Sequence, residues 1–331
     1  LTEAGVAYTV FRKIMENPRK EVVMEGAAFA REQGCDFILA LGGGAVLDAS
    51  KAIAAMATNP GDLWDYVSGG TGKGKPLVNP GLPIVTIPTS SGTGSEINCW
   101  GVISNLDTHE KIGFGAPGLV PVLSIVDPEL MKTVPPQYTA YQGFDALFHN
   151  TEVMISNGVN IISETIALSA IERIAKYLPL AVKNGEDLEA REHVAYGSTI
   201  AGIAMQLTST TAQHAMEHAM SAYHPNLPHG AGLIMISKAF SEFFIEKHAC
   251  DGQFIKMARA LTSHGILYTS FKYGTAEGER NGRYFTDMTE EKMDKLLKDV
   301  NSFDILEMWV TSDVRPGRAE EKWLNMILRK K

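Results

Sequence analysis

The chain has 331 residues, of which 45% are hydrophobic and 21% charged, and its formal net charge is −8. This composition is typical of a folded globular protein long enough for two domains, and it argues against disorder. Acidic and basic residues alternate without basic blocks, which excludes a broad nucleic-acid surface, and no apolar run reaches the about 18 residues that a membrane span needs.

The opening segment and the cysteines favour a cytoplasmic protein. Charged residues interrupt the first 16 positions, unlike a secretory signal. The three cysteines lie far apart and form no CxxC pair, which favours a reducing compartment. Because the chain begins with Leu1 and has no buried-strand pattern before residue 37, we expect its first amino-terminal portion to be missing.

The front third alternates predicted strands and helices. Residues 21–33 are amphipathic and helix-like, residues 37–41 form a short apolar run typical of a strand buried on both faces, and residues 46–56 are rich in helix formers. Further buried strands are predicted at 83–87 and 123–126. Short strands that alternate with helices predict a parallel α/β sheet with crossover helices.

The pattern changes after the two prolines at 135 and 136. Residues 138–256 contain no strand signal, and long apolar-periodic stretches at 161–182, 194–220 and 231–244 predict an all-α part. We therefore place a nucleotide-binding α/β domain at 1–134 and a helical metal and substrate domain at 135–331. The tail after about residue 263 has helix-like charged runs at 289–299 and 318–329, and no function is assigned to it.

Two glycine-rich loops follow predicted strands. Gly42, Gly43 and Gly44 lie between a strand and a helix, where close backbone approach and free helix amides suit a phosphate. Residues 88–96 (Pro-Thr-Ser-Ser-Gly-Thr-Gly-Ser-Glu) follow the next strand. Each loop alone could be a plain turn, but ligands bind at the carboxyl ends of strands in open sheets, so the pair indicates a nucleotide site.

Two clusters of titratable residues have spacings that suit a metal ion. Asp145 and His149 are four residues apart on a predicted helix, and His214 and His218 share this spacing. His229 lies in a Pro-His-Gly turn. A buried carboxylate is costly without a partner, and one carboxylate with two or three imidazoles suits iron(II), zinc, cobalt or nickel. For either pair alone, a hydrogen-bonded structural role is the alternative.

A second interpretation of this region is a zinc peptidase. His214, Glu217 and His218 match the HxxEH pattern. That pattern is short, arises easily by chance, and leaves Asp145, His149 and both glycine loops without a role, so we disfavour it.

The motifs together resemble one known family. In order along residues 20–260 they are Gly42-Gly43-Gly44 with Asp48 and Lys51, the 88–96 loop, Asp127-Pro128, Gly-x-Asp-Ala-x-x-His at 143–149, and Pro228-His229-Gly230. This set is similar to the iron-containing (group III) alcohol dehydrogenases, and residues 103–113 and 214–232 are similar to their butanol-dehydrogenase-like branch. The resemblance implies a Rossmann-like α/β domain followed by a helical domain, the dehydroquinate synthase-like superfamily fold.

The resemblance also implies roles for individual residues. The metal ligands would be Asp145, His149, His214 and His229, and His218 would line the site as a catalytic proton relay or substrate contact; His224 is a second candidate for the relay. The nicotinamide cofactor, NAD or NADP, would be held by Gly43, Gly44, Asp48, Thr89, Ser90, Thr93, Val102, Lys111 and Leu130.

The function implied is hydride transfer between a small alcohol or aldehyde and nicotinamide at Fe²⁺ or Zn²⁺, in a homo-oligomer of two or more chains without nucleic-acid or membrane partners. An NAD-using zinc lyase like 3-dehydroquinate synthase would need a pocket rich in Lys and Arg, and only Lys111 and a few others lie near the motifs. A non-catalytic nucleotide-sensing scaffold is a third possibility, disfavoured by the complete set of metal ligands.

Overall fold

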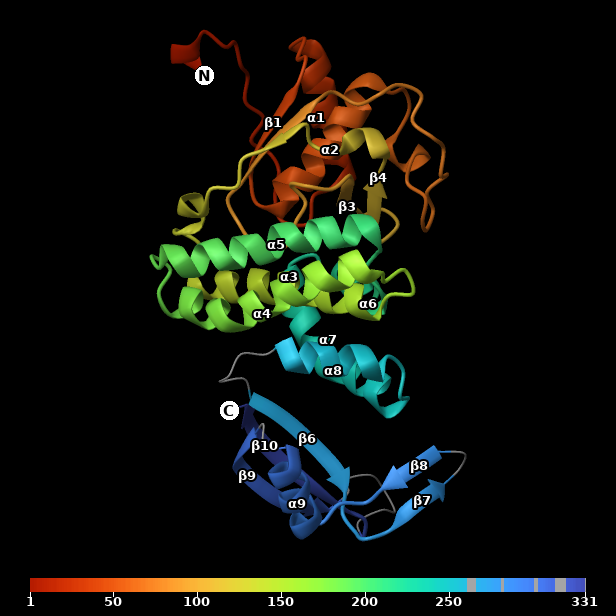
Figure 1. Cartoon of the computed structure of the whole chain (residues 1–331). Coiled ribbons are helices and arrows are strands. Elements are labelled where there is room, and N and C mark those ends of the chain that lie inside the picture. Colours follow the sequence, from red (N-terminus) through yellow and green to blue (C-terminus); the bar gives the residue numbers. More distant parts are fainter. Residues whose placement is uncertain (261–265, 281–282, 301–302, 313–319, 331) are drawn as a thin grey trace. The chain divides into compact units, whose positions relative to one another are not determined.

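The computed structural model describes residues 1–260, 266–280, 283–300, 303–312 and 320–330 (Figure 1). The chain forms two compact units, Leu1–Met257 and Ala258–Lys331. Within the described ranges, no helix combines the length and apolar character that crossing a bilayer requires. The proposed domain division near residue 134 falls inside the first unit, between the sheet and the long helices.

The first unit begins with a small parallel sheet. Strands β1 (Ile38–Gly42), β2 (Ile84–Pro88) and β5 (Leu123–Ser124) pair in the order β1-β2-β5. Helix α1 (Lys20–Glu32) packs on α2 (Gly44–Thr58), which packs on the strands. The predicted α/β fold with a parallel sheet is confirmed.

One face of this sheet carries the core. Alanines of α2 with no exposed surface, among them Ala49 and Ala52, allow close packing against Ala27 of α1. Strand β1 buries Ala40 (1% exposed), whereas Leu41 on its other face is 58% exposed. The expectation that this strand is buried on both faces is therefore wrong, because the helices α1 and α2 form their core on one face.

A β-hairpin that the sequence pattern did not reveal follows β2. Strands β3 (Trp100–Asn105) and β4 (Glu110–Gly115) pair antiparallel, with Ile103 opposite Ile112. Strand β3 contacts α2, and β4 contacts α6 of the helical part. The hairpin therefore links the two halves of the first unit.

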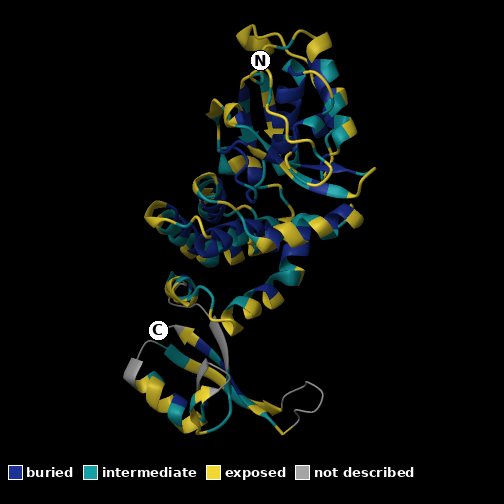
Figure 2. Cartoon of the chain, turned by 90° about the vertical axis from the view of Figure 1, so that its right-hand side faces the viewer, coloured by how far each residue is buried: buried dark blue, intermediate teal, exposed yellow. Residues whose placement is uncertain are grey.

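The helical part confirms the absence of strands between residues 138 and 256. It consists of α3 (Pro136–Ile155), α4 (Ile161–Lys183), α5 (Leu188–Leu207), α6 (Ala212–Tyr223), α7 (His229–Glu246) and α8 (Asp251–Ala260). Helices α3, α4 and α5 pack on one another, with their buried residues in dark blue in Figure 2. The stretch 194–220, predicted as continuous, is broken at residues 208–211, where four consecutive Thr and Ser residues separate α5 from α6.

The second unit is a separate small α/β structure. Its strands β6 (Ile266–Lys272), β9 (Phe303–Ser312) and β10 (Lys322–Lys330) form an antiparallel sheet with β10 in the centre, beside a hairpin of β7 (Glu277–Arg280) and β8 (Arg283–Thr286). Helix α9 (Glu290–Val300) matches the charged run predicted at 289–299. The helix-like prediction at 318–329 is wrong: Leu324, Met326 and Leu328 alternate into the core, as a strand requires.

The glycine-rich segment 68–74 is held by a carboxylate of the chain itself. Glu110 accepts hydrogen bonds from Thr71 N (2.7 Å), Thr71 Oγ1 (2.6 Å), Thr108 Oγ1 (2.6 Å) and Trp64 Nε1 (3.0 Å). Desolvation alone would raise the pKa of Glu110, but the hydroxyls of Thr108 and Thr71 and the indole of Trp64 lower it to about 2. Glu110 therefore fastens this segment to β4 and to Trp64.

Replacing Glu110 with Gln should lower stability at neutral pH by about 1 kcal/mol, since the group is partly exposed and solvent screens its interactions. The folded pKa of about 2 lies below the unfolded value of 4.5, so the carboxylate stabilises the fold above pH 4.5 and this contribution is lost as the pH falls toward 2. Urea unfolding of wild type and Glu110→Gln should differ at pH 7 and converge toward pH 3. Glu129→Gln, at an exposed position, is the control and should leave stability unchanged. Equal stability of wild type and Glu110→Gln at pH 7 would contradict the prediction.

Candidate active site

One cavity of about 1000 Å³ in the first unit collects the residues singled out in the sequence. Its lining includes Gly43, Gly44, Asp48, Thr89, Ser90, Thr93, Val102, Lys111, Leu130, Asp145, His149, His214, His218 and His229. Residues 14–18 and Trp100, which the sequence analysis did not select, also line it. A cavity of this size suits a cofactor together with a small substrate.

The two glycine-rich loops touch each other in the wall of the cavity. Gly43 is the N-cap of α2 and Gly44 its first residue, and no side chain caps this helix. A Cβ on Gly43 would lie 3.1 Å from Ser90 Oγ, and a Cβ on Gly44 would overlap Thr93. The two loops can therefore approach this closely because positions 43 and 44 are glycine. The uncapped amides of the helix lie beside the hydroxyl groups of Ser90 and Thr93, and this arrangement suits a phosphate.

Two buried charged residues of α2 form hydrogen bonds with the 88–96 loop and with β3. Asp48 accepts hydrogen bonds from Ser95 Oγ (2.6 Å) and Val102 N (2.8 Å). Lys51 donates to Ser95 Oγ (2.7 Å) and to the Trp100 carbonyl (2.5 Å). Burial raises the pKa of Asp48 and lowers that of Lys51 to about 8. These contacts hold the loop and the hairpin against α2.

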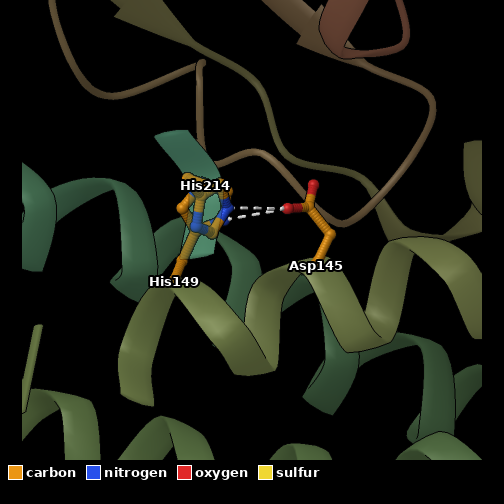
Figure 3. Close-up of side chains that lie close together, drawn as sticks. All are labelled: Asp145, His149 and His214. Atoms are coloured by element: carbon orange, nitrogen blue, oxygen red, sulfur yellow. Dashed lines mark hydrogen bonds and ion pairs between the residues drawn. The ribbon is translucent and has the colours of Figure 1, made fainter. Parts of the chain in front are cut away.

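A carboxylate and three imidazoles meet in the same cavity, where Gly92 of the second loop closely approaches the carboxylate: a Cβ there would lie 3.0 Å from Asp145 Oδ2. Asp145 Oδ1 lies 3.3 Å from His149 Nδ1, 3.3 Å from His214 Nε2 and 3.5 Å from His229 Nε2. Asp145 and His149 face the same way from successive turns of α3, and His214 reaches them from α6 (Figure 3). Potential ligand atoms of Asp145, His149 and His214 lie within 4.8 Å of one another, close enough to share one ion.

The charged groups at this point shift one another's pKa values. Burial alone would raise the pKa of Asp145, but the imidazoles of His149, His229 and His214 hold it below its usual range. Burial likewise opposes a charge on His214, yet Asp145 and Glu152 raise its pKa to about 9. Burial and the neighbouring His214 lower the pKa of His149 to about 4, so this imidazole is neutral at pH 7.

The Nδ1 atom of His149 is buried and has no hydrogen-bond partner among the described residues. A buried polar atom without a partner is costly and calls for a ligand that the protein side chains do not supply. A neutral nitrogen, an ionised carboxylate and two further imidazoles are also the donors that borderline divalent ions prefer. The residues present therefore fit a divalent metal ion.

Lys111 lines the cavity beside His229. Its Nζ donates to Glu217 Oε2 (3.2 Å) and lies 3.4 Å from His229 Nδ1. Burial lowers the pKa of Lys111, and Glu217 opposes this shift. Among the described residues that line the cavity, Lys111 is the only Lys or Arg, so the wall offers little to an acidic phosphate substrate.

The histidines of the 214–229 segment separate into different environments. His218 lines the cavity with its ring centre 5.5 Å from that of His229. His224 is exposed at the end of α6 and does not line the cavity, so the structure does not bring this candidate proton carrier to the site. Glu217 hydrogen bonds His229 Nδ1, an arrangement unlike the free catalytic glutamate of an HxxEH peptidase.

Two buried carboxylates, Glu152 and Glu217, are missing from the residues predicted to hold the metal or the cofactor, and Glu217 appears only in the disfavoured HxxEH pattern. Each lies three residues after a candidate ligand, His149 or His214, on the same helix face. That spacing is a detectable signal. The partner of each carboxylate could not be read from it, because Glu152 bonds His214 and Glu217 bonds His229 across segments.

Family models match most of the chain. Residues 1–128 match the model described as iron-containing alcohol dehydrogenase, and residues 139–301 match the carboxyl-terminal model of the same family. Among curated relatives, a choline dehydrogenase of Bacillus subtilis (strain 168) is 39% identical over 230 residues, which cover 70% of this chain and 56% of the relative. A probable NADH-dependent butanol dehydrogenase of the same organism is 37% identical over 71% of this chain and 60% of the relative.

The chain is also similar to solved structures of alcohol dehydrogenases. An archaeal halo-thermophilic alcohol dehydrogenase from a Red Sea brine pool superposes with a TM-score of 0.76 and 36% sequence identity, covering 78% of this chain and 66% of that one. The chain thus spans less than two thirds of the length of these three relatives.

Proposed function

Because this chain belongs to the iron-containing alcohol dehydrogenase family, we propose that it is a metal-dependent, NAD(P)-linked alcohol dehydrogenase or aldehyde reductase that acts on a small primary alcohol. The observation that carries the proposal is the meeting of Asp145, His149, His214 and His229 in the same cavity as both glycine-rich loops. We infer iron(II) or zinc as the ion, and NAD or NADP as the cofactor. A cytoplasmic location and assembly into a dimer or larger homo-oligomer complete the proposal.

In this proposal the ion is held by Asp145, His149, His214 and His229. When bound, it supplies Lewis-acid chemistry that lowers the pKa of an alcohol and polarises a carbonyl. Asp145 contributes the one negative charge of the donor set, and its own carboxylate is buried (4% exposed).

The cofactor would be oriented by the glycine-rich loops. Gly43 and Gly44 would present helix amides to the pyrophosphate, and Thr89, Ser90 and Thr93 would add hydroxyl donors. Asp48 holds the backbone of Val102, and Val102, Leu130 and Lys111 line the same cavity and are the proposed contacts to the ribose and nicotinamide. The role of the protein is to hold the nicotinamide against the carbon that gives or takes the hydride.

His218 is the proposed acceptor of the alcohol proton. Burial, and then the positive charge of Lys111, lower the pKa of His218 well below its usual value. The imidazole is therefore held in its neutral form, whose free nitrogen lone pair can accept a hydrogen bond from the alcohol. The lyase alternative receives no comparable support, because Lys111, the one Lys or Arg among the described residues lining the cavity, is already paired with Glu217.

The proposal is tested by purifying the chain without oxygen, measuring its metal content, and following reduced nicotinamide by absorbance with short alcohols and aldehydes. We expect about one divalent ion per chain and turnover that a chelator abolishes and Fe²⁺ or Zn²⁺ restores. A metal-loaded, folded chain that turns over no alcohol or aldehyde with either nicotinamide would refute the proposed activity.

A further inference from the structure

Two buried glutamates each accept a hydrogen bond from one of the proposed metal ligands. We propose that Glu152 and Glu217 are positioning residues that hold His214 and His229 in the tautomer and orientation needed for metal binding, and that Lys111 supports Glu217 as its counter-ion. The inference rests on the metal site of the proposed function and is independent of the identity of the substrate.

Glu152 fixes His214 from a different helix. It lies on α3 with no exposed surface, and its Oε2 accepts a hydrogen bond from His214 Nδ1. The imidazole proton is thereby held on Nδ1, and Nε2, which lies 3.3 Å from Asp145 Oδ1, is directed at the ion. Ring orientation and tautomer are set by the same bond.

The other oxygen of Glu152 anchors the start of α6. Oε1 accepts from Thr211 Oγ1 (2.6 Å) and from Gln213 N (2.8 Å). Thr211 is the N-cap of α6 but makes no capping bond with its own side chain. Glu152 therefore caps this helix from α3 and fixes the backbone on which His214 is carried.

Glu217 fixes the orientation of His229 through an equivalent hydrogen bond. It also has no exposed surface, and its Oε2 accepts from His229 Nδ1, while its Oε1 accepts from Ser221 Oγ. His229 is the first residue of α7, and its Nε2 lies 3.5 Å from Asp145 Oδ1. The bond links α6, which carries Glu217, to the beginning of α7.

Lys111 explains how Glu217 remains a carboxylate in this position. A buried charge is costly unless it is paired and hydrogen-bonded. Lys111 Nζ lies 3.2 Å from Glu217 Oε2, and both side chains are almost fully buried (5% and 0% exposed). Because Lys111 belongs to β4, the hairpin that lines the cofactor cavity also supports the metal ligand.

The same arrangement argues against a second ion. Glu217, His218 and His229 also offer ligand atoms within 4.8 Å of one another. However, the ammonium of Lys111 already lies 3.2 Å from the carboxylate and 3.4 Å from His229 Nδ1. A second divalent cation there would face this charge and would have to displace the proton on Nδ1, so this triad serves to position His229.

The test replaces each carboxylate by the isosteric amide. Glu152→Gln and Glu217→Gln should each weaken Zn²⁺ and Co²⁺ binding by about 10- to 100-fold in competition with a chelator. The visible absorption of the Co²⁺-loaded variants should change as well, because the ligand geometry changes. Lys111→Met should weaken binding by a smaller factor, since it leaves the bond from Glu217 to His229 in place.

Glu164→Gln is the control. Glu164 is a half-buried glutamate that accepts a hydrogen bond from Lys256 Nζ (2.7 Å), and it does not line the cavity. Circular dichroism establishes that each variant is folded before metal is added. Metal affinity within twofold of wild type for both Glu152→Gln and Glu217→Gln, or an equal loss in Glu164→Gln, would overturn the inference. Failure of the proposed function would instead appear as a wild-type chain that binds metal normally but does not oxidise alcohols.

Discussion

Asp145→Asn should lose its bound ion and nearly all turnover. Asp145 Oδ1 is the point that three imidazoles approach, at 3.3, 3.3 and 3.5 Å, and it is the one carboxylate in the proposed ligand set. An amide has the same shape but no charge to neutralise the ion. Loss of several kcal/mol of Lewis-acid stabilisation corresponds to a fall of roughly 1000-fold or more in kcat/KM. Metal content and steady-state kinetics measure both effects.

Nucleotide binding provides the internal control for this variant. The amides of Gly43 and Gly44 belong to α2 and are not among the proposed metal ligands, so the affinity for the nicotinamide cofactor should stay within a few-fold of wild type. His229→Ala should behave in the same way, losing metal and turnover but keeping the nucleotide. Full activity in either variant with no bound metal would contradict the assigned ligands.

Gly202→Val should destabilise the chain and weaken nucleotide binding together. Gly202 of α5 and Gly94 of the 88–96 loop are in direct backbone contact: a Cβ on Gly202 would overlap the Gly94 carbonyl, and one on Gly94 would lie 2.5 Å from Gly202 N. Gly94 also has a φ of +59°, which side chains rarely adopt. Overpacking of this kind costs about 3 kcal/mol.

The loss of affinity follows because the same loop carries Thr93. Pushing the loop away from α5 would move this hydroxyl away from Gly44, and we expect about a tenfold weaker affinity if one charge-assisted hydrogen bond is lost. Chemical denaturation and cofactor titration test the two effects. Gly118→Ala is the matched control, since a Cβ there meets no atom within 4 Å and should change stability by less than about 0.5 kcal/mol. A Gly202→Val chain as stable as wild type would show that the loop and α5 are not tightly packed.

The local parts of this protein could be predicted from the sequence. Apolar runs and helix-forming stretches gave β1, β2, α2 and α4 to within a few residues, because strand and helix periodicities depend on neighbouring residues. The spacing of Asp145 and His149 placed both side chains on one face of a helix for the same reason.

Contacts between distant segments required the tertiary structure. The sequence could place Glu152 and Glu217 beside the ligands on their own helices, but the bonds from Glu152 to His214 and from Glu217 to His229 depend on how α3, α6 and α7 pack. The exposure of one face of β1 depends on which elements pack on the sheet. The burial of Lys111 against Glu217 depends on the packing of β4 against α6. Periodicity is set by local backbone geometry, whereas the partner of a buried charge is set by the packing of elements far apart in the chain, and that packing decides which imidazole each carboxylate orients.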